Sequence, residues 1–226
     1  MTGTLTENDD MTIAPGIYAL HRAGEAPVPR ALDDAGTGLH VAAGVSDTGA
    51  GPGGVTVCIV TEGRARVGTA GEFGAGEAVV TQGATKIEAV DSGSSWVTVR
   101  CGDADLSGDA MPLRPSDHPE LPSCDPTPAD LLLSGPPAQH DLTLFKDQAC
   151  NFAAGFWDTT AYHRKSIAFP KFEVMHMLSG WIELTLDEGG THRFEAGDTF
   201  LIAKGTRCDW RTGGMGKIFC TLVPAT

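Results

Sequence analysis

Short stretches of apolar or alternating residues, separated by turns rich in glycine, run along most of this 226-residue chain. Each stretch covers about four to eight residues, a length and pattern typical of β-strands. The stretches with this pattern are residues 55–60, 77–81, 96–100, 164–169, 173–178, 181–186, 199–202 and 217–223. No amphipathic helix of comparable length competes with them, so we expect an all-β protein built from small antiparallel barrels or sandwiches.

The two halves of the chain resemble each other. Residues 73–77 (FGAGE) correspond to residues 194–198 (FEAGD), and each motif follows an apolar stretch that ends in glycine, Gly63 or Gly180. These two glycines lie 117 positions apart and the two AG turns lie 121 apart, so the second half has one hairpin longer by four residues. Such length changes at loop tips cost little free energy. The repeat therefore predicts two sequential domains of similar fold.

Local composition sets the expected boundaries. Residues 1–10 are polar and predict a disordered start, and residues 11–102 form the first barrel. Residues 103–140 are rich in proline and predict an irregular connector with one short helical candidate at 128–133. Residues 141–226 then form the second barrel.

Charge and cysteine content exclude several classes of function. The net charge of −13 and the absence of a Lys and Arg cluster argue against nucleic acid or an anionic membrane as a partner. There is no apolar run of about 20 residues and no signal-like start, so we expect a soluble, cytoplasmic protein. The six cysteines form no CxxC pair, which disfavours a disulfide framework or a structural zinc site.

The second half carries four motifs in order, namely GFWDTT at 155–160, Glu173 with Gly180 seven positions on, Gly197-Asp198 with GTRCDW at 205–210, and Gly216-Lys217. Together these motifs resemble the ureidoglycine aminohydrolase-like branch of the RmlC-like cupin superfamily, which also includes the ethanolamine-utilisation cupins. The resemblance and the repeat imply a bicupin, that is, two tandem cupin barrels of the double-stranded β-helix or jelly-roll type. They also imply a homodimer, since cupins pair their barrels through exposed strands.

The resemblance implies a metal site whose usual ligands are an HxH pair, a glutamate and a further histidine. Glu173 holds the glutamate position, whereas Cys208 replaces the last histidine. The HxH positions fall on Ile167 and Phe169, or on Ser166 and Ala168. Three of the four usual ligands are therefore missing from this chain.

A different ligand set is the alternative. His163, Glu173 and Cys208 would suit one divalent ion of manganese, zinc or iron. His176 does not fit this set, because strand alternation puts Glu173, Met175 and Met177 on one face and His176 on the other. The expected cofactor is thus either none or one such ion.

The second barrel also offers a polar pair. Lys217 stands where cupins of this branch often carry a lysine, so the resemblance implies that Glu173 and Lys217 lie on neighbouring strands across a small cavity. There they would act as the catalytic pair or capture a carboxylate. The expected substrate-binding wall consists of Trp157, Tyr162, Phe169, Met175, Arg207 and Trp210, with Met177 as a further wall residue and Arg164 and Arg211 as further carboxylate ligands. In the competing interpretation, Lys217 reaches the rim and the aromatic residues are simply core.

Two functions from different classes remain open. The first is a binding protein for a small carboxylate- or amine-bearing metabolite, with a structural first barrel in which Thr56 and Ile87 stand at the positions of Glu173 and Cys208. The alternative is a metal-dependent aminohydrolase-like or related enzyme, a hydrolase or lyase, that uses Glu173 with the unusual ligand set. The missing histidines favour the binding protein, and the retained glutamate and lysine favour a polar ligand.

Overall fold

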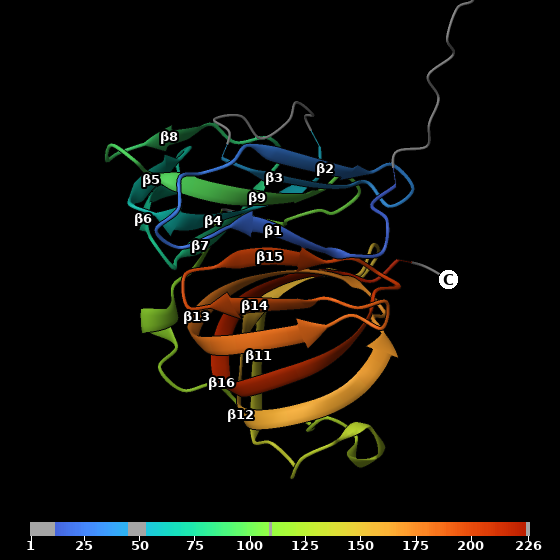
Figure 1. The fold of residues 1–226 in the computed structure, drawn as a ribbon. Coiled ribbons are helices and arrows are strands. Elements are labelled where there is room, and N and C mark those ends of the chain that lie inside the picture. Colours follow the sequence, from blue (N-terminus) through green and yellow to red (C-terminus); the bar gives the residue numbers. More distant parts are fainter. Residues whose placement is uncertain (1–11, 45–52, 109, 225–226) are drawn as a thin grey trace, which may run out of the picture.

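The computed structural model describes residues 12–44, 53–108 and 110–224, and β-strands dominate all three segments (Figure 1). Helical structure in these residues is confined to two 3-10 turns, η1 (Pro115–Asp117) and η2 (Ala129–Leu131). The prediction of an all-β protein is therefore confirmed. The predicted disordered start, residues 1–10, lies outside the described residues.

The first half forms a six-stranded antiparallel sheet and a smaller three-stranded sheet. The order in the larger sheet is β10 (Met111–Leu113), β7 (Ala78–Gln82), β4 (Val55–Glu62), β9 (Ser95–Cys101), β3 (Leu39–Ala43) and β2 (Arg30–Asp34). The order in the smaller sheet is β6 (Gly71–Gly74), β5 (Arg64–Val67) and β8 (Ile87–Ala89).

The second half forms one seven-stranded antiparallel sheet with longer strands. Its order is β1 (Ile17–His21), β15 (Thr199–Ile202), β13 (Phe172–Thr185), β16 (Arg207–Leu222), β12 (Phe152–Ala168) and β11 (Gln139–Asp147), with β14 (Thr191–Glu195) paired to β13. The two stretches predicted at 173–178 and 181–186 are continuous in β13, whose pairing with β16 shifts register on either side of Gly180.

The internal repeat is a repeat of strand order as well as of sequence. The two large sheets correspond strand by strand. The order in the first is β10-β7-β4-β9-β3-β2, and the order in the second is β1-β15-β13-β16-β12-β11. The register agrees too, because Val57 pairs with Val99 in the first sheet and Val174 pairs with Cys220 in the second. Val57 and Val174 lie 117 positions apart, and Val99 and Cys220 lie 121 apart. These are the offsets that separate the sequence motifs.

In each of the two large sheets, one edge strand comes from a segment outside the repeat that forms the rest of the sheet. β1, near the start of the chain, pairs with β15 of the second half, and Figure 1 shows it lying where the two halves meet. The Gly16 amide donates to Thr206 Oγ1 at 2.7 Å and extends this contact. In the same way β10, from the proline-rich connector, pairs with β7. Each added strand covers a sheet edge that would otherwise expose unpaired backbone groups.

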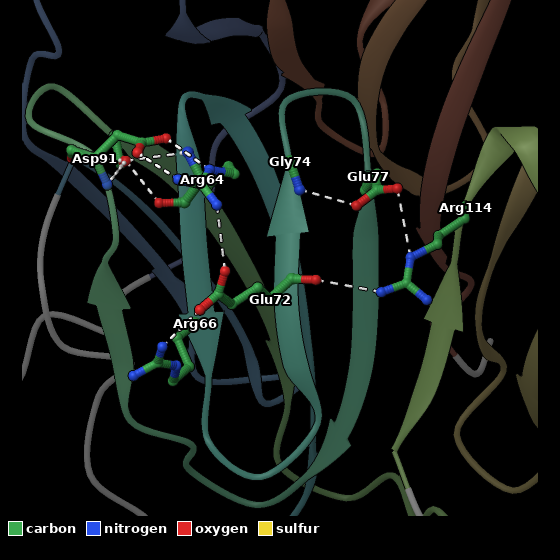
Figure 2. Close-up of polar contacts among 8 residues, drawn as sticks. Arg64, Arg66, Glu72, Gly74, Glu77, Asp91 and Arg114 are labelled. Atoms are coloured by element: carbon green, nitrogen blue, oxygen red, sulfur yellow. Dashed lines mark hydrogen bonds and ion pairs between the residues drawn. The ribbon is translucent and has the colours of Figure 1, made fainter.

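The turn at residues 74–77 shows how a strand is tied to the connector. The Gly74 amide donates to Glu77 Oε2 at 2.8 Å, and Arg114 Nε lies 3.4 Å from Glu77 Oε1. Arg114 Nη2 also donates to the Glu72 carbonyl at 3.2 Å, and its guanidinium lies over the Phe73 ring. Figure 2 shows these polar contacts running from Glu72 in β6 and from Glu77, just before β7, to Arg114, just after β10.

Strand alternation divides the core into three clusters. On β4, Val57 and Ile59 join a large cluster that contains residues of both halves, whereas Cys58 and Val60 join a cluster confined to the first half. On β13, Val174 belongs to the shared cluster and Met175 to a cluster confined to the second half. These strands are buried on both faces, which explains why they read as nearly continuous apolar runs.

Candidate ligand-binding site

The interior of the second half contains a cavity of about 650 Å³. Strands β11, β12, β13 and β16 supply most of its wall, and the connector supplies residues 125–128 and Leu131. Four of the expected wall residues line it, namely Trp157, Tyr162, Phe169 and Trp210, together with Glu173 and Lys217. A volume of this size suits a small metabolite.

Glu173 and Lys217 form a buried ion pair in the wall of the cavity. They lie on the paired strands β13 and β16, and Lys217 Nζ donates to Glu173 Oε1 at 2.8 Å. Both side chains are only 5% exposed. The other carboxylate oxygen of Glu173 lies 3.2 Å from Nζ of Lys171, so two lysines contact one carboxylate.

The two lysines keep Glu173 ionised despite its burial. Burial raises the pKa of its carboxyl group, but the charges of Lys171 and Lys217 outweigh this effect and bring the pKa down to about 2. Burial lowers the pKa of the Lys217 ammonium, against the opposing effect of Glu173. Glu173 is therefore ionised near neutral pH, and a charge-assisted hydrogen bond joins it to Lys217.

Aromatic rings surround the ammonium group. Lys217 Nζ lies 4.7 Å from the ring centroid of Trp157 and 5.0 Å from that of Trp210. The two indole rings meet edge to face at 6.2 Å, and Tyr162 stacks on Trp210 at 6.4 Å. The ring faces attract the cation and offset part of its desolvation. Met175 is buried beside Lys217, with its sulfur 3.3 Å from Nζ, and does not itself line the cavity.

A second buried cation lies in the same wall. Arg164 on β12 is 5% exposed and lines the cavity. Its Nη1 donates to the carbonyls of Lys165 and Cys208 at 3.1 and 3.2 Å, and its guanidinium carbon lies 5.6 Å from the centroid of Trp210. Burial lowers the pKa of this guanidinium. Because the ordinary pKa of arginine is very high, the group stays protonated.

The proline-rich connector contributes to the site, which the sequence did not predict. The Thr127 amide donates to Gln139 Oε1 at 2.7 Å, and the Leu133 amide donates to the His163 carbonyl at 2.8 Å. The helical candidate at 128–133 is only the single 3-10 turn η2, after which Leu132 bridges to Arg164. The connector is thus hydrogen-bonded along β11 and β12, beside the cavity.

Lys171 and Gln139 also line the cavity, although neither was singled out from the sequence. For Lys171 a signal was present. It precedes Glu173 by two positions, so strand alternation places both side chains on the same face. For Gln139 we find no comparable signal.

Two of the arginines considered for carboxylate binding lie outside the site. Arg207 is exposed and donates to Asp187 Oδ2 at 2.8 Å, and Arg211 is exposed with Nη1 3.8 Å from Glu183 Oε1. Neither lines the cavity. Both alternate along β16 with residues whose side chains point inward, such as Trp210, which explains their outward direction.

The structure does not bring Glu173, His163 and Cys208 together. His163 Nε2 lies 3.2 Å from Asp209 Oδ2, and its neighbour in the β12–β16 ladder is the outward-facing Arg211. Cys208 is fully buried, and burial raises the pKa of its thiol, whereas metal ligation requires the thiolate. Nowhere in residues 12–44, 53–108 and 110–224 do three or more His, Cys, Asp or Glu side chains form a group able to hold a metal ion. The donor set proposed from the sequence therefore does not fit a metal.

His176 lies on the face of β13 opposite Glu173, as the alternation predicts. It is 2% exposed, and its Nδ1 lies 2.8 Å from Thr199 Oγ1. Burial lowers the pKa of its imidazole to about 4, with a further lowering from the nearby His21.

The first half lacks an equivalent of the ion pair. The repeat aligns Thr56 with Glu173, and the Thr56 hydroxyl donates to the Gly83 carbonyl at 2.9 Å. The ladder pair Val60 and Trp96 corresponds to Met177 and Lys217, so Trp96 stands at the position of the lysine. The uncharged indole of Trp96 and the hydrogen-bonded hydroxyl of Thr56 thus stand in place of the two charged groups.

Both the sequence and the fold of this chain resemble those of known proteins. Residues 147–213 match the family described as the EutQ-like cupin domain, a range that contains Glu173, Trp157 and Trp210. Together with the all-β architecture, this match assigns the chain the cupin fold. No curated protein matches the chain.

Three solved structures extend the likeness over nearly the whole chain. A DUF861-family protein of unknown function from Pseudomonas syringae pv. tomato str. DC3000 is 20% identical, with a TM-score of 0.78, and the match covers 92% of this chain and 100% of that one. A cupin 2 conserved barrel domain protein from Leptotrichia buccalis is 11% identical (TM-score 0.59; 95% and 100% covered). Protein Ylba from E. coli, also of DUF861, is 13% identical (TM-score 0.55; 96% and 94% covered). At these identities the likeness shows the fold alone.

In the part of the chain that the structure describes, no helix is long and apolar enough to cross a membrane.

Proposed function

We propose that this protein is a bicupin that binds a small polar metabolite, bearing a carboxylate or an amine, in the cavity of its second barrel. In this proposal residues 11–102 and 141–226 are the two barrels and residues 103–140 connect them, except that β1 extends the sheet of the second barrel and β10 extends the sheet of the first. The observation that carries the proposal is the ion pair of Glu173 and Lys217 in the wall of a 650 Å³ cavity.

The cost of burying charge supports a functional role for this pair. Removing two ions from water costs several kcal/mol per ion, and apolar residues of similar volume often give equal or greater stability. The first half, with Thr56 and Trp96 at the same positions, is built without the pair. Strongly shifted ionisable groups inside a cavity are typical of binding and catalytic sites. The second barrel is thus the functional one, and the first serves as its structural partner.

A screen of small carboxylates and amines by thermal shift, followed by calorimetric titration, tests the proposal. The decisive variant is Glu173→Gln with Lys217→Met, because it removes both charges and leaves neither uncompensated. A matched control is Glu183→Gln with Arg211→Met, which removes an ion pair of 3.8 Å outside the cavity. We expect the first double variant to lose binding and the control to keep it. A screen without any ligand, or equal binding by both variants, contradicts the proposal.

The alternative is a metal-dependent aminohydrolase-like or related small-molecule enzyme. It is favoured by one observation, which is that Glu173 is retained at the position of the cupin glutamate ligand. The donors His163 and Cys208 do not fit such a site, for the reasons given above. Elemental mass spectrometry of protein purified without a histidine tag tests the alternative. Near-stoichiometric metal that disappears in Glu173→Ala would establish it, and metal-free protein would remove it.

The homodimer expected from the sequence stays a prediction, which light scattering coupled to size-exclusion chromatography tests.

A further inference from the structure

The charges around the ion pair in the cavity wall do not cancel. Arg164, Lys171 and Lys217 contribute three positive charges and Glu173 contributes one negative charge, a net charge of +2. The remaining charged residues of the wall are Lys146, Asp125 and Asp141, and they leave the cavity as a whole at +1. A cavity with this charge balance attracts an anion.

Glu173 does not require a cationic ligand. Each of its carboxylate oxygens already contacts a lysine ammonium, at 2.8 Å for Lys217 and 3.2 Å for Lys171. A ligand amine would have to compete with both ammonium groups, and displacing Lys217 would leave a buried charge without a partner, which is strongly unfavourable. Of the two ligand types open under the proposed function, this geometry disfavours the amine.

Arg164 lacks the counter-ion that Lys217 has. Within the described residues, no carboxylate lies within ion-pair distance of its guanidinium, whose hydrogen-bond partners are the carbonyls of Lys165 and Cys208 and the side chain of Cys208. None of these partners is a carboxylate, although the Arg164 side chain is only 5% exposed. Trp210 Nε1, in the same wall, is a buried donor without an acceptor in this part of the chain. Buried cations are normally paired and buried donors are normally satisfied, so both groups call for an acceptor that the chain does not supply.

The apolar surface beside Arg164 suits a flat body. Trp157 is half-buried, and its ring meets that of Trp210 at an interplanar angle of 83°. Tyr162 stacks on Trp210 at an interplanar angle of 24°. Phe169 completes this side of the cavity. Planar ring faces pack well against an aromatic or conjugated ligand.

We propose that the ligand is a carboxylate with a flat apolar body, and that the Arg164 guanidinium binds its carboxylate group. This inference rests on the proposed function and selects one ligand class within it. Two parallel N–H···O hydrogen bonds from Arg164 would fix the orientation of the carboxylate. The rings of Trp157 and Trp210 would then contact the body of the ligand.

Calorimetric titration with benzoate, benzamide and benzylamine tests this inference. These probes share one ring and differ in whether the substituent is anionic, neutral or cationic. We expect benzoate to bind about 10-fold or more tightly than either of the others, since a charge-assisted bidentate pair is worth at least that factor. Tighter or equal binding of benzamide or benzylamine overturns the inference and leaves the proposed function standing.

Variants of Arg164 supply the second test. Arg164→Met removes the charge, and Arg164→Lys keeps it but loses the planar fork, so that both are expected to weaken benzoate binding, Met more than Lys. The control is Arg211→Met, an exposed arginine on a strand that lines the cavity but with its own side chain outside it. If Arg164→Met does not fold, Arg164→Lys and the probe series on the unaltered protein still decide the matter. Benzoate affinity unchanged in the folded Arg164 variants overturns the inference. So does an absence of binding by all three probes, and the metabolite screen then decides the proposed function separately.

Discussion

Asp198 in the second half and Glu77 in the first half hold equivalent positions, and each pairs with an arginine from outside its own repeat. Arg22 Nη1 donates to Asp198 Oδ2 at 2.9 Å, and its guanidinium lies 4.1 Å from the Phe194 centroid. Arg114 likewise pairs with Glu77, with Nε 3.4 Å from Oε1 (Figure 2). Its guanidinium lies 4.8 Å from the Phe73 centroid. The arginine, the carboxylate and the ring therefore form a motif that attaches an outer strand to each sheet.

Asp198→Ala is expected to detach this motif in the second half. Besides Arg22, the carboxylate accepts hydrogen bonds from the amides of Ala23 and Glu195 at 3.0 and 2.9 Å. Leaving these donors without their acceptor should lower the free energy of unfolding by about 2 to 4 kcal/mol. Urea denaturation measures this change. The control is Asp187→Ala, which removes an exposed partner of Arg207 and should change nothing measurable. Equal effects of the two variants would show that the motif does not stabilise the sheet.

Lys217→Met is expected to destabilise the fold by removing one partner of a buried carboxylate. Lys171 remains beside Glu173, so we expect a loss of about 3 kcal/mol, at the lower end of the range for a broken buried pair. Adding Glu173→Leu should restore part of this loss, because no uncompensated charge is then buried. Lys86→Met, at an exposed pair with Glu88, is the control. A loss below about 0.5 kcal/mol in urea denaturation would contradict the buried pair.

The lowered pKa of His176 predicts that the fold loses stability in mild acid. Its folded pKa of about 4 lies below the unfolded value of 6.5, so the neutral imidazole stabilises the fold fully above pH 6.5. As the pH falls from 6.5 to about 4, the unfolded chain binds a proton that the folded protein does not, which removes roughly 3 kcal/mol. The neighbouring charges are His21, which lowers the pKa further, and Asp198, which raises it.

The test of this pH dependence compares urea denaturation at pH 7 and pH 4.5. His176→Asn should lose most of the contribution from position 176, whereas His192→Gln, at a half-buried site on β14, should retain it. An unchanged pH dependence in His176→Asn would show that another group is responsible.

Gly180→Ala is expected to disrupt the junction of β13 and β16. The residue has a φ of +70°, and a Cβ there would overlap the Gly214 carbonyl oxygen. Because backbone cannot move aside easily, we expect a loss of more than about 3 kcal/mol. Gly190→Ala is the matched control, since its φ of +92° carries the same conformational penalty with no atom within 4 Å of the added Cβ. Melting temperatures of the two variants separate the overlap from the φ strain, and equal shifts would exclude the overlap.

Several features of the fold and site were predictable because they depend on local periodicity and on the internal repeat. Alternation along residues 173–177 placed Glu173 and His176 on opposite faces, and the repeat predicted that the two halves share one architecture. The resemblance to the cupins placed Glu173 and Lys217 on neighbouring strands, where they form their ion pair. The roles of these residues, the domain boundaries and the ligand stay predictions.

What only the tertiary structure decided concerns contacts between segments far apart in the chain. No local pattern indicates that β1 pairs with β15, that residues 125–131 wall the cavity, or that Arg164 faces inward while Arg207 and Arg211 face out. The bulge between Arg164 and Ile167 shifts the register of β12, and each such shift changes which side chains point to the interior. The sequence by itself determined the strands, which follow from short-range alternation, and the repeat, which follows from similar motifs at nearly constant offsets, whereas the charged pair was expected from the resemblance to the cupins. The pairing of distant strands and the sum of charges in the cavity depend on packing, which no single segment encodes.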